Sequence, residues 1–341
     1  MKVFYNEAYT AAAHAFDTTR KSGEIATAMD EGSVPGCEVV DPIDFVDLAE
    51  KLIEETHASA YVEALRTGEP HELAASQGFN WDEGIWGMAV NSTAGVLAAV
   101  DEALATGGSS GSLSSGLHHA RRAGGVGYCT VNGLAMAATR ATELVSGTVV
   151  ILDLDAHCGG GTNELIGGDG RILHLDLSTS SFDSYSPDGD DELTVLHGPS
   201  DVEYLEHVSA YLGRIPDDTG LVIYNAGMDP HPTVSAEGLA QRERLVAAWC
   251  ARHGVPAAFV LAGGYTWGVT MDELVDLHLN TVRAFAGREP SASGDLSSAT
   301  RQPTHTTKQD YLDGSDHNNQ YPGQQIAVQP SELRPTQTLL R

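Results

Sequence analysis

Residues 149–157 read Val-Val-Ile-Leu-Asp-Leu-Asp-Ala-His, an apolar run that ends in two carboxylates and an imidazole. A continuous apolar run is typical of a central parallel strand that is buried on both faces. Asp153, Asp155 and His157 stand at alternate positions, so we expect them to point to one side while the strand continues. Acids that end such a strand need a hydrogen bond, an ion pair or a metal. The stretch therefore predicts a metal site, although Asp153 could instead simply cap the following turn.

Strand-like and helix-like patterns alternate on both sides of this stretch, which indicates one α/β domain with a central, mostly parallel sheet flanked by helices. The patterns predict strands over residues 1–6, 149–157, 171–177, 221–225 and 257–261, and helices over 11–31, 44–66, 88–106, 132–145 and 237–253. An irregular segment is expected over 68–86, and the Gly-Gly-Ser-Ser-Gly run at 107–111 is expected to end the third helix. Residues 1–287 are predicted to form the domain. The polar residues 288–341 are predicted to form a disordered tail.

The later strands also end in reactive side chains. The strand after the central one carries Asp176, Asp229 follows the next, and Tyr265 follows the last behind two glycines. Ligand sites of open α/β sheets lie at the carboxyl ends of the strands, so these residues are expected to converge. The tandem His118-His119 lies between glycines, outside any amphipathic pattern. Core packing explains it poorly, although an incidental surface loop remains an alternative.

The composition is strongly acidic, with 47 Asp and Glu against 19 Lys and Arg and a formal net charge of −28. Such a surface argues against nucleic acid as a partner. A halophile-type surface explains it better than steering of cationic substrates. No apolar stretch reaches membrane-spanning length and no signal peptide is recognisable, which predicts a soluble, cytoplasmic protein without a membrane partner. The four cysteines are scattered, and Cys158 is expected to be a small buried residue rather than a ligand.

The reactive residues suggest one kind of chemistry. Asp155, His157 and Asp229 would hold a metal and leave positions open for water and a substrate oxygen. His118 and His119 would transfer protons, and the phenol of Tyr265 would stabilise an oxyanion. Together they predict hydrolysis of an amide or ester carbonyl.

With these residues in view, residues 1–285 resemble the zinc-dependent histone deacetylase and acetylpolyamine amidohydrolase family, which has the arginase/deacetylase fold. The motifs at 116–120, 153–157, 226–229 and 263–265 occur in the family's order. The resemblance implies a Zn²⁺ ion, with Fe²⁺ as an alternative, at Asp155, His157 and Asp229, and an acetyl-lysine or acetylpolyamine substrate. It also implies the following roles: His118 paired with Asp153, His119 as general base and acid, Tyr265 as the transition-state tyrosine, Gly127, Tyr128, Asp82 and Gly264 at the substrate, and a K⁺ or Na⁺ site around Asp153, Asp155, His157 and Asp176.

One position departs from the family. Gly160 stands where members usually carry an Asp or Asn that orients the second tandem histidine. We therefore hypothesise a less basic His119 and slower turnover, unless another acid substitutes. A catalytically weak binder of acylated ligands, or a hydrolase of another small amide, remains an alternative. A two-metal arginase-like enzyme is disfavoured because Cys158 and Gly159 stand where further aspartates would be needed. The sequence leaves the oligomeric state open.

Overall fold

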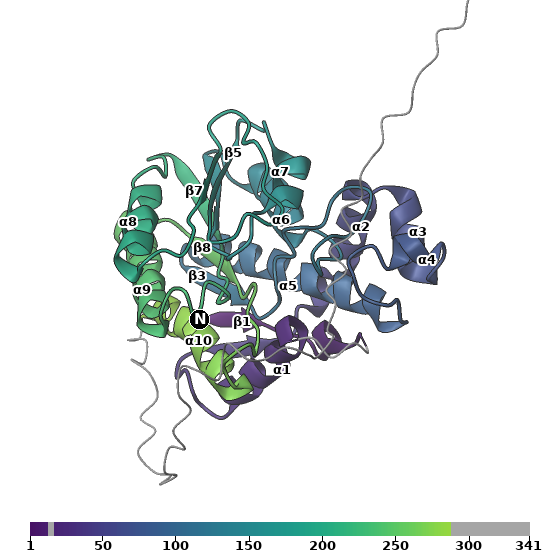
Figure 1. Cartoon of the computed structure of the whole chain (residues 1–341), viewed down its shortest axis with the longest axis horizontal. Coiled ribbons are helices and arrows are strands. Elements are labelled where there is room, and N and C mark those ends of the chain that lie inside the picture. Colours follow the sequence, from purple (N-terminus) through teal and green to yellow (C-terminus); the bar gives the residue numbers. More distant parts are fainter. Residues whose placement is uncertain (13–16, 288–341) are drawn as a thin grey trace, which may run out of the picture. The chain divides into compact units, whose positions relative to one another are not determined.

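The computed structural model describes residues 1–12 and 17–287, and within them eight strands form a single parallel sheet (Figure 1). The strands lie in the order β2-β1-β3-β8-β7-β4-β5-β6, so strands that are distant in the sequence are neighbours in the sheet. Their bounds are β1 Lys2–Phe4, β2 Glu38–Val40, β3 Ser109–Ser112, β4 Thr148–Asp153, β5 Ile172–Ser178, β6 Glu192–Val195, β7 Thr219–Asn225 and β8 Ala257–Val260. The predicted α/β fold with a central parallel sheet is confirmed.

Strand β4 lies inside the sheet, between β7 and β5, and is buried on both faces. Val150 and Leu152 belong to one hydrophobic core, whereas Val149 and Ile151 belong to a second. Successive side chains of a strand point to opposite faces, so a strand between two cores must be apolar at every position. This explains why the run reads as continuous rather than alternating.

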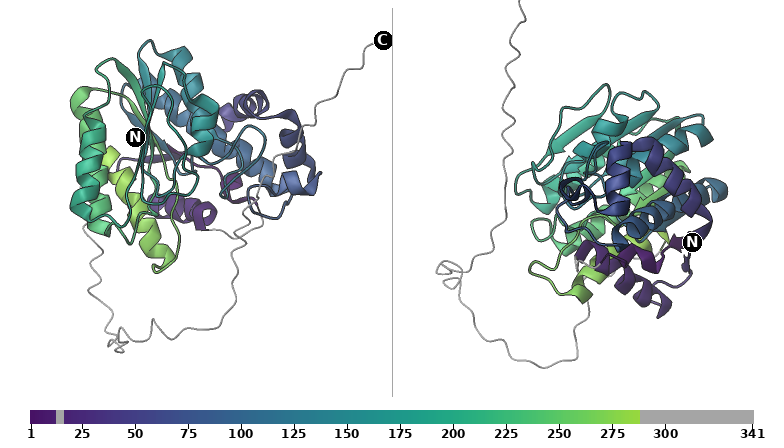
Figure 2. Two further views of the ribbon diagram at one scale, coloured as in Figure 1. Left: turned by 45° about the horizontal axis from the view of Figure 1, so that its top comes forward. Right: turned by 90° about the vertical axis from the view of Figure 1, so that its right-hand side faces the viewer.

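Helices cover both faces of the sheet, as the two further views show (Figure 2). One core is shared with α1, α8, α9 and α10, and the other with α2, α3, α5, α6 and α7. The bounds are α1 Asp17–Asp30, α2 Val46–Thr56, α3 Ser59–Thr67, α4 His71–Ala74, α5 Gly84–Thr106, α6 Gly133–Leu144, α7 Gly160–Ile166, α8 Asp201–Leu212, α9 Ala236–His253 and α10 Met271–Phe285, with 3₁₀ turns η1 Glu7–Thr10 and η2 Ile43–Phe45. No helix among the described residues has both the length and the apolar character needed to cross a bilayer.

Several element predictions need correction. The helix predicted over 44–66 is two helices, because the chain is extended at His57 and Ala58 between α2 and α3. The short helix α4 lies in the segment expected to be irregular. Strands β2, β3 and β6 were not predicted. Strand β4 ends at Asp153, so Asp155 and His157 lie in the following turn and do not continue the strand's alternation.

The strand register brings polar side chains of three adjacent strands together near the carboxyl edge of the sheet. Asp153 at the end of β4 pairs with Asp176 of β5 on one side and with Asn225 of β7 on the other. Asp153 and Asn225 are the last residues of β4 and β7, and Asp176 lies two residues before the end of β5. The predicted tail at 288–341 lies outside the described residues.

Candidate active site

The first of the tandem histidines is tied directly to the end of β4. His118 Nδ1 lies 2.8 Å from Asp153 Oδ2, and both side chains are buried. The side-chain amide of Asn225 donates a hydrogen bond of 2.8 Å to the other oxygen of Asp153. Each oxygen of this buried carboxylate therefore has a partner, as a buried charge requires. The predicted pairing of His118 with Asp153 is what the structure contains.

Beyond the strand ends, Asp155, His157 and Asp229 form a compact cluster in which one ligand atom from each lies within 4.8 Å of the others. His157 Nδ1 is 3.3 Å from Asp155 Oδ1 and 3.1 Å from Asp229 Oδ2. Backbone amides fix the carboxylates: Gly263 donates to Asp155 Oδ2 at 2.8 Å, and Ala156 donates to Asp229 Oδ1 at 2.9 Å.

This cluster fits a metal ion. Asp229 Oδ2 is buried, and its 3.1 Å contact with His157 Nδ1 does not have hydrogen-bond geometry, so this oxygen lacks a hydrogen-bond partner. Burial and the nearby Asp155 raise the pKa of Asp229, because two buried carboxylates side by side repel each other. A cation between the two carboxylates would offset their repulsion and give Asp229 Oδ2 a partner. Imidazole nitrogens and carboxylate oxygens are both Zn²⁺ ligands, and three protein ligands leave a position open, as catalytic zinc sites do.

Two glycines let the backbone approach these carboxylates closely. A Cβ atom on Gly263 would lie 2.2 Å from Asp229 Oδ2, and one on Gly227 would lie 2.6 Å from Asp155 Oδ2. Both contacts are shorter than any side chain tolerates. The glycines in the Ala-Gly-Met-Asp and Gly-Gly-Tyr motifs are therefore required by the packing around the cluster.

The electrostatic environment drives the pKa values of the tandem histidines apart. Burial alone would lower the pKa of His118, but the carboxylates of Asp153 and Asp155 outweigh burial and raise it to about 10. For His119, burial and the positive charge of His118 lower the pKa to about 4, despite a hydrogen bond to Asp183. The two neighbouring rings therefore differ in charge near neutral pH, where His118 is an imidazolium and His119 is neutral.

The second tandem histidine has a carboxylate partner that does not come from the Gly160 turn. His119 Nδ1 lies 2.9 Å from Oδ2 of Asp183, which belongs to the loop between β5 and β6. Arg121 forms an ion pair with the other oxygen of Asp183. Residue 160 is a glycine, and the carboxylate that contacts His119 is that of Asp183.

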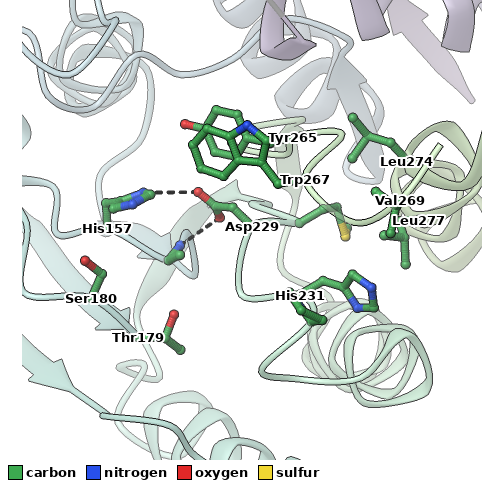
Figure 3. Close-up of a pocket in the computed structure, with 13 residues that line it drawn as sticks. His157, Thr179, Ser180, Asp229, His231, Tyr265, Trp267, Val269, Leu274 and Leu277 are labelled. Atoms are coloured by element: carbon green, nitrogen blue, oxygen red, sulfur yellow. Dashed lines mark hydrogen bonds and ion pairs between the residues drawn. The ribbon is translucent and has the colours of Figure 1, made fainter. Parts of the chain in front are cut away.

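Tyr265 borders the same site, and Figure 3 shows its ring stacked on that of Trp267 beside His157 and Asp229. The two ring centroids are 4.4 Å apart and the ring planes are nearly parallel, with an interplanar angle of 9°. Burial, followed by the charges of Asp229 and Asp155, raises the pKa of Tyr265, so the phenol keeps its proton and can donate it in a hydrogen bond. Tyr265 and His157 together line two cavities, one of about 200 Å³ on the side of Trp267 and one of about 30 Å³ on the side of the tandem histidines.

Two aromatic residues that do not line the smaller cavity, Phe79 and Phe182, pack against residues that do. Tyr128 lines it and stacks on Phe79 with ring centroids 4.8 Å apart. The Phe182 ring is perpendicular to the rings of His119 and His157, with centroids 5.1 and 5.8 Å away. Gly127 fits between the two sides, since a Cβ there would lie 2.7 Å from the His119 ring and 2.8 Å from the Phe182 ring.

Comparison with known protein families matches residues 14–282 to the histone deacetylase domain. The chain belongs to this family. An uncharacterized protein of Picosynechococcus is 30% identical over 228 residues, which are 62% of this chain and 75% of that protein. Histone deacetylase 2 of Arabidopsis thaliana is 28% identical over 167 residues, 45% of this chain and 43% of its own length. The fold matches a crystal structure of acetylpolyamine aminohydrolase from Burkholderia pseudomallei with a TM-score of 0.66 at 19% identity, covering 84% of this chain and 98% of that one.

Other residues assigned through the resemblance to the deacetylase family have ordinary structural contacts. The Asp82 carboxylate accepts a hydrogen bond of 2.8 Å from the Gly84 amide at the start of α5, which suits a capping role. Gly264 packs on His278, whose Nε2 would lie 2.6 Å from an added Cβ. Substrate contact at Asp82 and Gly264 stays a prediction. Cys158 is fully buried, as expected, and burial raises the pKa of its thiol to about 12.

The residues proposed for a monovalent cation are divided between two clusters. Asp155 and His157 belong to the first cluster, whereas Asp153 and Asp176 join His174 in a second one that is fully buried. Tyr185 donates a hydrogen bond of 3.1 Å to Asp176 and closes this second cluster. The K⁺ or Na⁺ site stays a prediction.

Several residues of the site were missed from sequence, among them Arg121, His174, Phe182, Asp183 and Asn225. A signal existed for His174 and Asn225, because both lie in the apolar strand runs where a polar residue needs a reason. No comparable signal marks Phe182 and Asp183, which lie in a polar loop rich in Asp and Ser. Only the path of that loop brings them to His119.

Proposed function

We propose that this protein is a metal-dependent amidohydrolase that removes an acetyl or similar acyl group from acetyl-lysine or an acetylpolyamine. One observation carries the proposal: Asp155 and His157 of the Asp155–His157–Asp229 cluster line one cavity together with the tandem histidines and a half-buried Tyr265, whose raised pKa keeps its phenol protonated. Membership of the histone deacetylase family supports the same class of reaction.

Zn²⁺ or Fe²⁺ held by Asp155, His157 and Asp229 would polarise the substrate carbonyl and lower the pKa of a water molecule. The protein's own residues then perform the proton transfers. His119 accepts a proton from the attacking water and delivers it to the amine nitrogen as the C–N bond breaks. The products are a carboxylate and a free amine.

The remaining side chains stabilise charge. The imidazolium of His118, held by Asp153, places a positive charge beside His119 and keeps that ring neutral before it accepts a proton. The phenol of Tyr265 donates a hydrogen bond to the carbonyl oxygen as it gains negative charge. Loss of one such donor typically lowers kcat by roughly 10²–10³-fold.

The test is turnover of the metal-loaded protein on an acetyl-lysine peptide and on acetylputrescine, in low and in high salt. We expect release of acetate from at least one substrate, and its strong reduction in Tyr265→Phe and His119→Ala. His207→Ala is a matched control, because His207 lies on α8 and its ring hydrogen-bonds to a backbone carbonyl of that helix. It should leave turnover unchanged. The substrate with the higher kcat/KM identifies the substrate class.

Metal removal gives a separate prediction. A chelator should abolish turnover, and added Zn²⁺ or Fe²⁺ should restore it. Asp229→Asn should lower the bound metal, measured by elemental analysis, as well as the activity. Stoichiometric metal with no turnover on either amide would contradict the proposal and favour a binder of acylated ligands.

A further inference from the structure

We propose that Asp183 is the residue that positions His119 for proton transfer, and that residue 160 is a glycine because Asp183 occupies the space of its side chain. The proposal deepens the function proposed above, since it rests on His119 as the proton-transfer residue. It assigns a role in this site to the loop between β5 and β6.

The geometry around Asp183 is that of a fixed partner. Its side chain is only 4% exposed, and its Oδ2 lies 2.9 Å from His119 Nδ1. Its backbone adopts the left-handed conformation, with φ of 59°, which is uncommon for a residue other than glycine. Such a conformation persists only where the surroundings hold it in place.

Arg121 provides much of that restraint. Its guanidinium pairs with Oδ1 of Asp183, donates to the carbonyl of Gly160 at 3.3 Å, and contacts the carboxylate of Glu164 at 3.0 Å. Both oxygens of Asp183 therefore have partners, one on His119 and one on Arg121. The arginine also links the Asp183 loop to the first turn of α7.

Gly160 completes the arrangement. A Cβ atom there would lie 2.4 Å from the carbonyl oxygen of Asp183 and 2.6 Å from its Oδ1. A side chain at residue 160 and the Asp183 carboxylate therefore cannot occupy this space together. The two positions depend on each other: a glycine at 160 leaves room for an acid that arrives from another loop.

This hydrogen bond has a direct chemical consequence. A carboxylate only accepts hydrogen bonds, so the proton of neutral His119 stays on Nδ1 and Nε2 keeps its lone pair. The ring is also held at a fixed angle, and a partner of this kind is typically worth about 10–100-fold in activity.

The test compares Asp183→Ala and Asp183→Asn with Asp190→Asn in the metal-loaded full-length protein. Asp190 is an exposed acid of the same loop, so its replacement controls for loss of one negative charge. We expect kcat to fall about 10–100-fold in Asp183→Ala, with KM changed less than about twofold, because orientation rather than binding is lost. Asp183→Asn keeps an acceptor for His119 and should retain a higher kcat than Asp183→Ala.

A second readout is independent of turnover. In proton NMR the His119 Nδ1–H should give a downfield signal that is absent in Asp183→Ala and in His119→Ala but present in Asp190→Asn. Loss of that signal supports the positioning role even if neither amide substrate is hydrolysed. The proposal is overturned if the signal persists in Asp183→Ala, or if active protein shows equal kcat for Asp183→Ala and Asp183→Asn.

Discussion

At residue 160, an aspartate introduced to match the family pattern would collide with Asp183. Overpacking of this kind typically costs about 1–3 kcal/mol. We therefore expect Gly160→Asp to lower both kcat and the free energy of unfolding, measured by turnover and urea denaturation. Gly170→Asp is the control, since a Cβ at Gly170 has no neighbour within 4 Å. Faster turnover in Gly160→Asp would contradict this, because it would show that the Asp183 loop can move aside without lowering activity.

Gly263 supplies a second prediction at the scale of a single residue. A methyl group there would lie 2.2 Å from Asp229 Oδ2 and 2.6 Å from Asp155 Oδ2, so both proposed metal ligands would have to move. We expect Gly263→Ala to bind metal at least about 10-fold more weakly, the lower end of what altered ligand orientation costs. Titration with Zn²⁺ against a chelating indicator measures this, with Gly87→Ala as control because its Cβ has open space. Unchanged affinity would contradict a metal site at these carboxylates.

Among the structural elements, the break between α2 and α3 has a role at the site. His57 Nδ1 lies 2.9 Å from the carbonyl oxygen of Arg121, and its Nε2 accepts a hydrogen bond of 3.2 Å from the backbone N–H of Asn132. Asn132 is the N-cap of α6, and its side chain binds the carbonyl oxygens of His118 and Ala120. The segment that breaks the predicted long helix thus supports the loop of the tandem histidines.

This arrangement predicts a pH dependence of stability. His57 can make both of these hydrogen bonds only as the neutral ring, because Nε2 must accept. Burial lowers the pKa of His57 below the usual 6.5. Below pH 6.5 the unfolded chain therefore binds a proton at His57 that the folded chain does not, so stability is complete above that pH and decreases as the pH falls. The free energy of unfolding falls by at most about 1.4 kcal/mol per pH unit, and this fall continues until the pH reaches the pKa of His57 in the folded state.

Urea denaturation of the wild type and of His57→Gln between pH 7.5 and 5.5 measures this contribution. The wild type should lose more stability over that range than the variant, because the variant has no proton to take up at residue 57. The variant should already be less stable at pH 7.5. Parallel pH profiles of the two proteins would show that His57 does not titrate between the two states.

For the whole molecule, the net charge of −28 determines the response to salt. Self-repulsion among surface carboxylates opposes the compact state, and salt screens it, since the Debye length falls from about 10 Å at 0.1 M to about 3 Å at 1 M. We expect the Tm to rise between these salt concentrations. The rise should be smaller in the triple variant Asp190→Asn, Glu206→Gln, Asp217→Asn, whose three acids are exposed. An equal rise in Tm in the wild type and the triple variant would show that these three surface charges do not cause the salt dependence.

The sequence alone determined the features that depend on local pattern. A buried parallel strand must be apolar throughout. In residues 149–157 an apolar run gives way to acids and a histidine where the strand ends. This stretch therefore indicated both the fold and the position of the site. Residues such as Asp155, Asp229 and Tyr265 follow different strands, and parallel strands bring their carboxyl ends to one edge. Their convergence could therefore be predicted without coordinates.

Only the tertiary structure decided features that depend on distant parts of the chain. Strand β3 reads Ser-Ser-Gly-Ser, a sequence with little strand propensity. Its pairing with β1 and β8 makes it a strand, and Gly111 is required because a Cβ there would lie 2.1 Å from the Phe259 ring. Asp183 likewise has no local pattern that marks it. It reaches His119 because a loop from the neighbouring strand passes over Gly160, and no spacing within the sequence encodes the meeting of two such segments.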